Sequence, residues 1–476
     1  MIASLMSGTS LVFLETAYVI VIWAIRLFMI ATVPLRRSPQ AAASWLLLIF
    51  FLPIPGLLIY LAIGRRAFPK CRADRFAQLA PFFAETAERM AKATPLGHRI
   101  SQDVVDLATR LSDLPAVNGN MLEFLDDYDD IIDRLIVDID AARRHVRLLI
   151  YIFADDSTGR KVLAALARAV RRGVACHVLL DPVGSRSWRR RTLTALRVAG
   201  VDVRETLPVA PWRPRKRADM RNHRKLFITD GVTGYVGSLN IVDKNFCPGI
   251  TNQELEMRVT GPVVAAMTAI FIADWFMETE VMLETEICVP PASGTAISQV
   301  LPSGATYPLM GFETILIWQI HNARKRVILT TPYFIPDDAL ISAMHTAVAR
   351  GVEVILIVSA VADQKFVQLA QSSYYDDLLC GGIRIHLFGR YFLHAKNVSI
   401  DGNLGIVGSS NVDIRSFQLN EEVSLLLLDR PAIAKLEAIQ AQALEQSAAI
   451  DLETWRQRPK LQQIGEGLAR LVSPLL

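Results

Sequence analysis

One arrangement of reactive and hydrogen-bonding residues occurs twice in this chain. The first copy consists of His223, Lys225, Asp230, Gly237, Ser238 and Asn240. The second copy begins 171 positions later and consists of His394, Lys396, Asp401, Gly408, Ser409 and Asn411. A lone His-x-Lys arises often by chance, but two copies with six matching positions at identical spacings indicate a shared purpose.

These residue types suit chemistry at a phosphate. Imidazole can act as a nucleophile or transfer a proton, a lysine ammonium is a point charge suited to phosphate, and Ser and Asn add neutral hydrogen bonds. Phosphodiester transfer needs one group to attack phosphorus and another to protonate the leaving alkoxide. Because each motif holds a single imidazole, we expect His223 and His394 to share one cleft. Lys225 and Lys396 would neutralise the non-bridging oxygens, so no metal or other cofactor is expected.

A β-hairpin is the element predicted to position each motif. Residues 226–229 and 397–400 are β-type runs, and the Asp-Gly pairs that follow them are strong tight-turn signals. Returning strands are predicted over 232–236 and 404–407. Side chains two residues apart on a strand point to the same face, so each His lies beside its Lys. The returning strand then brings the Ser and the Asn to the same patch.

The chain from residue 118 onward alternates strand and helix patterns, and the order repeats. A strand over 146–153, a helix over 160–172 and a strand over 174–180 have counterparts at 328–334, at 340–349 and after Gly351. The pattern predicts an α/β fold built by tandem duplication of one unit, with a largely parallel sheet and helices outside it. A pseudo-twofold arrangement of the two units would bring both motifs together.

Two apolar stretches precede the duplicated units. Residues 41–64 carry no formal charge and are long enough to cross ~30 Å of hydrocarbon, although Pro53 and Pro55 would kink such a helix. Residues 11–33 are the weaker candidate because they include Glu15 and Arg26. We therefore predict a transmembrane hairpin over 1–64, a linker with a surface helix over 65–110, and two similar domains over 111–290 and 291–476.

Charge distribution bears on partners and orientation. The net charge is only +4, so the chain is not a polycation, and no nucleic-acid partner is expected. Basic residues after the second apolar stretch outnumber those in the loop before it, which favours a cytoplasmic body. The residues after it are Arg65, Arg66, Lys70, Arg72 and Arg75, and those in the loop are Arg36 and Arg37.

The paired motifs resemble those of the phospholipase D superfamily, whose members carry two His-Lys-Asp motifs. The hydrophobic hairpin and the segment Thr331-Pro-Tyr-Phe-Ile-Pro336 are similar to bacterial cardiolipin synthases within it. The resemblance implies tandem phospholipase D-like domains with mixed β-sheets flanked by helices and related by a pseudo-twofold. It also implies an enzyme of the bacterial inner membrane that acts on phosphatidylglycerol among anionic lipids.

The resemblance further implies roles for individual residues. A phosphatidyl group would pass from one phosphatidylglycerol to another through a covalent intermediate on His223, with His394 as acid and base. Glu254 and Glu422, each in an Asn-x-Glu pattern after a motif, would orient the imidazoles, since a carboxylate on Nδ1–H leaves Nε2 free. Ser238, Asn240, Ser409 and Asn411 would bind or orient the phosphate. Lys225, Asp230, Lys396 and Asp401 complete the catalytic set, in which the two aspartates could be mostly structural and grip the turn.

Several alternatives remain open from the sequence. The enzyme could transfer the phosphatidyl group to water or another alcohol, it could be a nuclease, or the protein could be a lipid-binding scaffold without catalysis. Glu254 and Glu422 could be ordinary strand-edge carboxylates. Near the C-terminus, a helical stripe of apolar residues is interpreted as a core face, with a membrane-contacting surface as the alternative. That stripe consists of Leu461, Ile464, Leu468 and Leu471.

Overall fold

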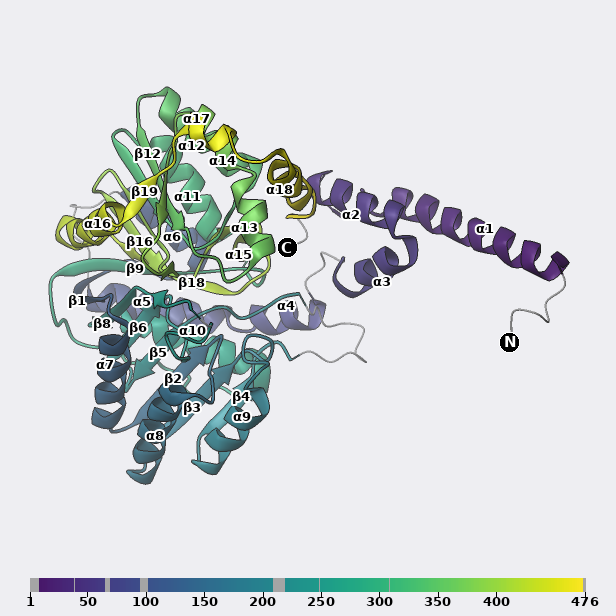
Figure 1. Cartoon of the computed structure of the whole chain (residues 1–476). Helices are drawn as coiled ribbons and strands as arrows, with labels where there is room; N and C mark the ends of the chain where they lie inside the picture. The colour runs from purple at the N-terminus through teal and green to yellow at the C-terminus, as the bar shows by residue number, and fades with distance from the viewer. Residues whose placement is uncertain are drawn as a thin grey trace.

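The computed structural model describes residues 8–37, 39–64, 69–94, 102–208, 219–247, 249–307 and 309–473. A two-part α/β body carries a helical extension that projects from one side (Figure 1). The first half of the duplication forms one part of the body and the second half forms the other, with the strands of both near the seam. Arg65 and Arg66, used above for orientation, lie outside the described residues.

One sheet of 15 strands runs through both halves, in the order β19-β13-β12-β10-β15-β16-β18-β9-β1-β8-β6-β5-β2-β3-β4. The first half supplies β1 (Val117–Leu125), β2 (His145–Ile150), β3 (Ala175–Leu180), β4 (Asp202–Glu205), β5 (Leu226–Thr229), β6 (Thr233–Gly237) and β8 (Glu256–Thr260). The second half supplies β9 (Ala296–Ser303), β10 (Arg326–Thr330), β12 (Glu353–Ser359), β13 (Arg384–Phe388), β15 (Asn397–Ile400), β16 (Leu404–Gly408), β18 (Glu422–Leu427) and β19 (Ser447–Ala449). The order reads the same outward from the β1–β9 junction on both sides, apart from β19. This palindrome is the predicted pseudo-twofold.

The sheet is mixed, so the prediction of a largely parallel sheet from the alternating pattern is wrong. Only β2-β3-β4 and β10-β12-β13 are parallel, and the motif strands β5-β6-β8 and β15-β16-β18 pair antiparallel. The physical reason is the Asp-Gly turn in each motif, because a three-residue connection can join only antiparallel neighbours. The mixed sheets implied by the family resemblance are present.

Helices cover the sheet, and three apolar cores result. The helices of the first half are α7 (Tyr128–Ala141), α8 (Ser157–Arg171), α9 (Arg189–Val198) and α10 (Val264–Thr279). Those of the second half are α11 (Gly311–Asn322), α12 (Asp338–Ala349), α13 (Lys365–Ser372), α14 (Tyr375–Cys380), α15 (Ile414–Gln418), α16 (Arg430–Glu445), α17 (Leu452–Arg456) and α18 (Lys460–Val472). Helix α10 is buried almost all round, which matches its nearly continuous apolar sequence.

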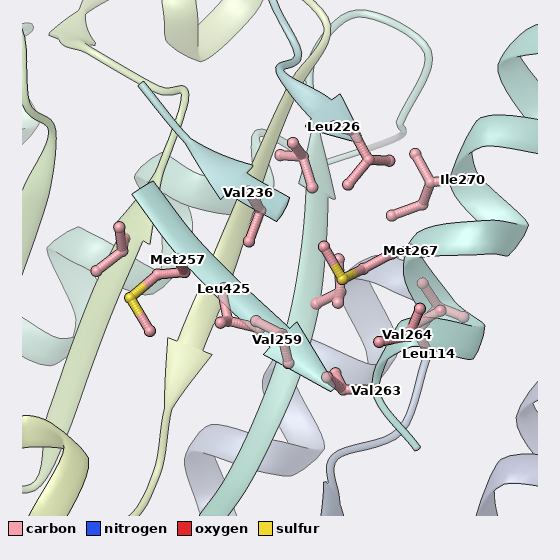
Figure 2. Close-up of a cluster of buried hydrophobic side chains, with 14 of the residues drawn as sticks. Leu114, Leu226, Val236, Met257, Val259, Val263, Val264, Met267, Ile270 and Leu425 are labelled. Carbon is pink, nitrogen blue, oxygen red and sulfur yellow. The ribbon is translucent and has the colours of Figure 1, made fainter. Parts of the chain in front are cut away.

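The largest core joins the two halves. It contains Val236 and Met257 from the first half together with Leu425 from the second, and α10 contributes Met267 and Ile270 (Figure 2). Because both motif hairpins press side chains into this shared core, neither half can shift without disturbing the other. The core therefore holds the two motifs in a fixed relation.

Residues 65–110 are predicted as a linker with a surface helix, and their described parts belong to three helices that pack on the body. They are α4 (Lys70–Ala77), α5 (Ala80–Ala93) and α6 (Gln102–Ser112). Helix α5 buries Phe82, Phe83 and Met90 in the core shared by both halves, and α6 buries its own apolar face against the second half. The error arose because a short amphipathic helix has the same sequence pattern on a surface as on a core.

The extension consists of α1 (Gly8–Thr32), α2 (Pro39–Phe51) and α3 (Pro53–Ile63). Among the described residues one helix, over 12–32, is long and apolar enough to cross a membrane. The second predicted span is broken at Leu52, since Pro53 has no N–H with which to continue α2. The expected ranking of the two stretches is thus reversed. Arg26 is accommodated in α1 because its guanidinium donates to the Phe50 carbonyl at 2.8 Å.

Candidate active site

A cavity of about 660 Å³ opens where the two halves meet. Its walls include His223 and Asn240 from the first motif and His394 and Asn411 from the second. The structure therefore brings both predicted imidazoles into one cleft. Had they faced separate solvent pockets, they could not act on the same phosphorus atom. The other predicted residues lie around or behind this cleft, as their contacts show.

The two motif aspartates hold the hairpin turns and lie outside the cleft. Asp230 and Gly231 have φ of 54° and 67°, and Asp401 and Gly402 have 55° and 66°, the left-handed values that a type I′ turn requires. The Asp230 carboxylate accepts three backbone N–H bonds, from Arg143 to His145, at 2.7–3.0 Å.

Asp401 makes the equivalent three bonds, to the N–H groups of residues 324 to 326, at 2.7–2.9 Å. Each aspartate thus ties the far end of its hairpin to the start of the neighbouring strand, with a four-residue strand between it and the motif histidine. Neither aspartate is among the described residues that line the cleft, and their contacts fit the expected structural role of gripping the turn.

Each motif histidine is held by a carboxylate from the other half. His223 Nδ1 lies 2.9 Å from Glu422 Oε1, and His394 Nδ1 lies 2.8 Å from Glu254 Oε1. Both carboxylates are fully buried. With Nδ1 engaged, Nε2 is the ring nitrogen left for chemistry on each histidine. The crossed pairing makes the site dependent on both halves at once.

Short backbone pairings bring the partners across the seam. His394 donates its N–H to the Gln253 carbonyl at 2.8 Å, beside β14 (Phe392–Leu393), which pairs in parallel with β7 (Asn252–Gln253). His223 donates its N–H to the Glu421 carbonyl at 2.9 Å in the equivalent place. Each orienting glutamate follows one of these seam pairings by one residue, so the main chain aims it at the opposite histidine.

The motif serines and lysines support the histidine–glutamate pairs from behind. Ser409 Oγ donates to Glu422 Oε2 at 2.5 Å, and Ser238 Oγ accepts the N–H that follows Glu254 at 3.0 Å. Neither serine lines the cleft, so of their two predicted roles the geometry supports orienting. Lys225 Nζ donates to the carbonyl of its own motif histidine at 2.8 Å, and Lys396 does likewise at 2.5 Å.

Burial shifts the pKa values of the basic groups downward. The pKa of His223 is well below its usual value because the imidazolium would lose its hydration and would lie near the charges of Lys225 and Lys396. Burial also lowers the pKa of Lys225 to about 7 and that of Lys396 to about 8. A phosphate bound beside these ammonium groups would favour their charged forms, so substrate binding and lysine protonation reinforce each other.

The two glutamates differ. Burial raises the pKa of Glu422 to about 7. Burial acts in the same direction on Glu254, but the neighbouring His394 and Lys396 outweigh it and hold the pKa of Glu254 below its usual value. Burial lowers the pKa of His394, and the Glu254 carboxylate opposes that change. The His394–Glu254 pair is therefore the better place to keep a proton on an imidazole.

Arg224, between His223 and Lys225, was not singled out from the sequence. Its guanidinium is buried and donates to Asp274 on α10 at 2.5 and 2.6 Å, to Glu421 at 3.1 Å and to the Glu422 carbonyl at 2.9 Å. It thus joins the first motif to the strand that carries the orienting glutamate of the second half. The one available signal was a break in the duplication, since Ala395 takes the matching place.

Replacing Arg224 with methionine is expected to lower the free energy of unfolding by about 3–5 kcal/mol. The change would leave the carboxylates of Asp274 and Glu421 buried without their cation. Thermal unfolding of the detergent-solubilised protein measures it. Arg168→Met is the matched control, because Arg168 pairs with Asp140 on the exposed surface and should hardly matter. Equal, small shifts in both variants would contradict the role given to Arg224.

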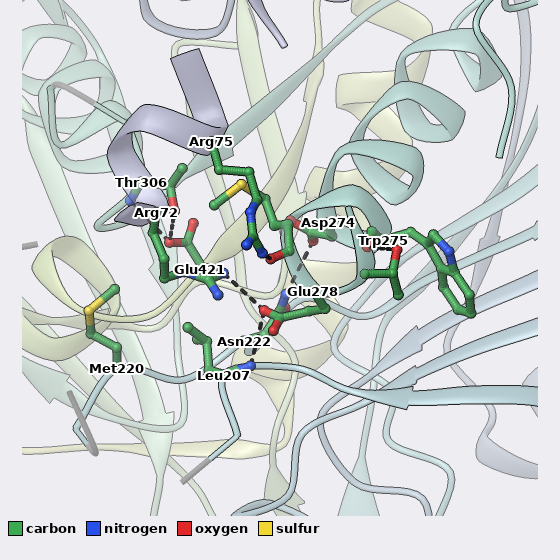
Figure 3. A network of polar contacts seen from close by, with 12 residues as sticks. Arg72, Arg75, Leu207, Met220, Asn222, Asp274, Trp275, Glu278, Thr306 and Glu421 are labelled. Atoms are coloured by element: carbon green, nitrogen blue, oxygen red, sulfur yellow. Dashed lines mark hydrogen bonds and ion pairs between the residues drawn. The ribbon is translucent and has the colours of Figure 1, made fainter. Parts of the chain in front are cut away.

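The same network reaches the helix that follows the membrane extension. On α4, Arg72 pairs with Glu278 of α10 at 2.9 Å, and Arg75 donates to the Met277 carbonyl at 2.5 Å. Figure 3 shows Arg75 above Glu278, with Arg72 and Glu421 on the left of the network and Asp274 on its right. Helix α10 therefore carries contacts from α4 at its C-terminal end and from Arg224 of the first motif one turn earlier. The body is fixed to the first helix beyond the extension.

Comparison with known proteins agrees with this architecture. A family model described as "Cardiolipin synthase, PLD-like domain" matches residues 135–275 and 316–443, and one described as "Phospholipase_D-nuclease N-terminal" matches residues 18–65. The phosphatidylserine synthase of Haemophilus influenzae Rd KW20 shares the fold of the body, with a TM-score of 0.59 and 16% identity over 78% of this chain and 99% of that one.

Relatives also match along the whole length. Cardiolipin synthase A of Pectobacterium carotovorum subsp. carotovorum (strain PC1) is 34% identical, with 97% of this chain and 100% of the relative covered. Cardiolipin synthase A of Escherichia fergusonii is 34% identical with the same coverage. The resemblance inferred from the paired motifs is confirmed, and the chain belongs to the PLD-like cardiolipin synthase family.

Proposed function

We propose that this protein is a cardiolipin synthase that transfers a phosphatidyl group from one phosphatidylglycerol to another and releases glycerol. The observation that carries the proposal is the crossed pair of histidine–glutamate contacts around a single cleft, in a chain of this family. Two imidazoles with engaged Nδ1 atoms supply a nucleophile and an acid–base group, which is what a two-step transfer at phosphorus needs.

In the first step His223 Nε2 attacks the phosphorus of phosphatidylglycerol. The bond between phosphorus and the oxygen of the glycerol headgroup breaks, and His394 gives its proton to that oxygen. Lys225 and Lys396 stabilise the charge that gathers on the non-bridging oxygens. The products are free glycerol and a phosphatidyl group bound to His223.

In the second step a hydroxyl of another phosphatidylglycerol enters where glycerol left. His394, now neutral, takes the proton of that hydroxyl, and its oxygen attacks phosphorus. The phosphorus–nitrogen bond breaks, cardiolipin forms, and His223 is restored. The sum of the two steps needs no nucleotide, because the energy of the first phosphodiester is kept in the adduct and then in the product.

Electrostatics support giving His223 the role of nucleophile. A nucleophilic imidazole must be neutral, and burial with two nearby lysines lowers the pKa of His223 well below its usual value. An acid must hold a proton, and the ionised Glu254 favours the protonated form of His394. The two motifs have matching residues, but the charged groups around them give His223 and His394 different proton affinities.

Glu254→Gln and Glu422→Gln are expected to move opposite limbs of the pH profile for adduct formation. Glu254 raises the pKa of His394, so its loss lowers that pKa, and the basic limb, where the acid loses its proton, moves to lower pH. Loss of the Glu422 carboxylate lowers the pKa of His223, so the acidic limb moves to lower pH. Single-turnover rates with labelled phosphatidylglycerol measure both. The reverse assignment of limbs would mean that each glutamate serves the histidine of its own half.

The protein is membrane-associated, as its family and apolar α1 indicate. We further propose that the extension inserts into the bacterial inner membrane and that the body lies on the cytoplasmic side. Lys70, Arg72 and Arg75 follow the extension directly, and basic residues at a membrane boundary favour the cytoplasm. Cysteine labelling from either side of oriented vesicles tests the orientation.

A single assay tests the proposed function. Purified protein in detergent is incubated with labelled phosphatidylglycerol, with and without phosphatidylethanolamine, and the lipid products are separated. Cardiolipin and glycerol in equal amounts support the proposal. Phosphatidic acid alone would make the protein a hydrolase, and absence of any product with every lipid pair would overturn the enzymatic function altogether.

A further inference from the structure

The cleft has unlike sides, although its walls come from a duplication. Next to His223 it is basic. Arg221 and Arg415 line it there, and Tyr151 packs edge-on against the His223 ring with 4.7 Å between centroids. Burial raises the pKa of Tyr151, while the positive charges of Arg415 and Arg221 act against that rise. This side suits an anionic group.

Next to His394 the cleft instead carries a hydroxyl and a carboxylate. Phe392 stacks on His394 with 5.8 Å between ring centroids and also contacts Tyr333 at 6.2 Å. The Tyr333 hydroxyl donates to Asp363 Oδ2 at 2.7 Å. The other carboxylate oxygen, Asp363 Oδ1, is buried without a hydrogen-bond partner among the residues that the structure describes.

Asn411 adds a second acceptor in the same cleft. Its side chain is buried, with 6% exposed, and lines the cleft, yet its Oδ1 finds no donor in the described part of the chain. A buried acceptor left without a donor costs about 1–3 kcal/mol, so two together suggest that a ligand supplies the donors. A carboxylate repels phosphate, so the matching ligand is neutral and has several O–H groups.

We propose that Asp363, Tyr333 and Asn411 bind the glyceryl headgroup through its vicinal hydroxyls. The inference rests on the proposed function, because beside His394 is where the headgroup departs and the second lipid enters. Acceptors in this position select an alcohol with neighbouring hydroxyls over a simple alcohol or water. A site built to accept hydroxyl hydrogen bonds discriminates strongly against ligands that lack them.

The test compares two acceptors competing for one adduct. Full-length enzyme is given phosphatidylglycerol with equal concentrations of isotope-labelled glycerol and 1-propanol, and the ratio of labelled phosphatidylglycerol to phosphatidylpropanol is measured. Asp363→Asn should lower the preference for glycerol over 1-propanol about tenfold or more. Any slower formation of the adduct affects both products alike and cancels in their ratio. Tyr333→Phe should shift the ratio in the same direction. An unchanged ratio, or an equal loss with both alcohols, would overturn the proposal.

A binding readout separates this proposal from the proposed function. Saturation-transfer NMR with the soluble headgroup glycerophosphoglycerol needs no turnover. Contacts from its glycerol protons should be present in the wild type and lost in Asp363→Asn. If they persist in that variant the headgroup site is refuted, and if they are lost the site stands even should cardiolipin synthesis fail.

The exposed face of α18 carries a second, independent inference. Leu461, Ile464, Leu468 and Leu471 are 50–84% exposed, so the interpretation of this stripe as a core face is wrong. The opposite face of the helix is the buried one, through Ala469. A row of four exposed large apolar side chains requires a partner outside the body.

The position of α18 identifies that partner. Helix α18 packs on α13, and Ser473 and Val367, from the ends of these two helices, line the rim of the active-site cleft. Phe366 on α13 is likewise exposed, and α18 lies on the side of the body from which α1–α3 extend (Figure 1). Lys460 at the start of α18 and Lys365 at the start of α13 are exposed cations that suit anionic headgroups.

We infer that the α18 stripe seats the rim of the cleft in the bilayer surface. An amphipathic helix binds a membrane with its apolar face about 5–10 Å deep. In that position a lipid could place its phosphate between the histidines while its acyl chains stay in hydrocarbon. The extension would anchor the body to the membrane, and α18 would fix the orientation of the body relative to the bilayer surface.

Photo-crosslinking tests this contact directly. The full chain is reconstituted in vesicles of phosphatidylethanolamine and phosphatidylglycerol that contain a lipid with a diazirine acyl chain. After irradiation, labelled peptides are identified by mass spectrometry. The tryptic peptide 461–470 should be labelled at least several-fold more than 162–168 from α8, which lies at the far end of the body in Figure 1. Equal labelling would refute the inference.

Activity provides the second arm. Ile464→Gln/Leu468→Gln should lower the rate on vesicle lipid about tenfold and leave the rate on dissolved short-chain phosphatidylglycerol unchanged. Val137→Gln/Val198→Gln is the matched control, since both valines are exposed on helices of the first half. Equal effects of the two double variants, or equal losses on both substrates, would count against a seating role for α18.

Discussion

His223→Asn should form no covalent phosphatidyl adduct and should lose cardiolipin synthesis by at least ~10⁴-fold, the scale of loss expected when a nucleophile is removed. Asparagine keeps a polar side chain of similar length but cannot attack phosphorus. Ser409 donates a hydrogen bond to Glu422, and this contact does not depend on the His223 ring. The pocket around residue 223 should therefore keep its structure in the variant. The measurement is acid-quenched protein from labelled phosphatidylglycerol, with the bound label located by mass spectrometry.

His321→Asn is the matched control, since His321 is exposed on α11 and does not line the cleft. It should retain full activity and full labelling of the adduct. Label found on His394 in the wild type would reverse the two histidine roles. A labelled His223→Asn protein would remove the covalent step at that residue from the mechanism.

The sequence was sufficient for the part of the site that is local. His and Lys share a strand face, the Asp-Gly pair makes the turn, and Ser and Asn return on the next strand. These relations depend on a few residues of known geometry, so spacing alone predicts them. The duplication also predicts the pseudo-twofold. Two copies of one unit have equivalent apolar faces, and symmetric packing buries both of them against each other.

What the sequence could not provide is the exchange across the seam. The spacing of the residues does not tell whether Glu254 contacts His223 or His394. That choice depends on how strand ends far apart in the sequence pair across the seam. The role of Arg224 was hidden for the same reason, as its partners Asp274 and Glu421 are 50 and 197 residues away. Long-range contacts are set by the packing of the whole core.

The helices were misjudged where burial could not be read from pattern. An apolar stripe predicts that one face of a helix is covered. It does not tell whether the protein core or another surface covers that face. Helix α5, in the segment expected to be a linker with a surface helix, places its stripe in the shared core. Helix α18, expected to face a core, leaves its stripe exposed. The stretch over 41–64, expected as one kinked span, is divided into α2 and α3 for a local reason, the missing N–H of Pro53.

His394→Asn should slow both half-reactions by ~10²–10⁴-fold, the usual contribution of a positioned acid–base group. The variant keeps His223, so its nucleophile is intact and its defect lies in proton transfer. A donor lipid whose leaving group is a nitrophenol, far more acidic than glycerol, needs no proton from the enzyme. With that donor the first step should recover toward the wild-type rate.

The second step has no such remedy, because the incoming hydroxyl still needs a base. The phosphatidyl adduct on His223 should therefore accumulate in His394→Asn given the nitrophenyl donor, with a burst of one nitrophenol per active site and then slow turnover. Recovery of both steps would mean that another group acts as base, and no recovery of the first would mean that His394 positions the substrate. A burst without turnover would distinguish the nucleophile, His223, from the acid–base group, His394. The sequences of the two duplicated motifs do not make that distinction.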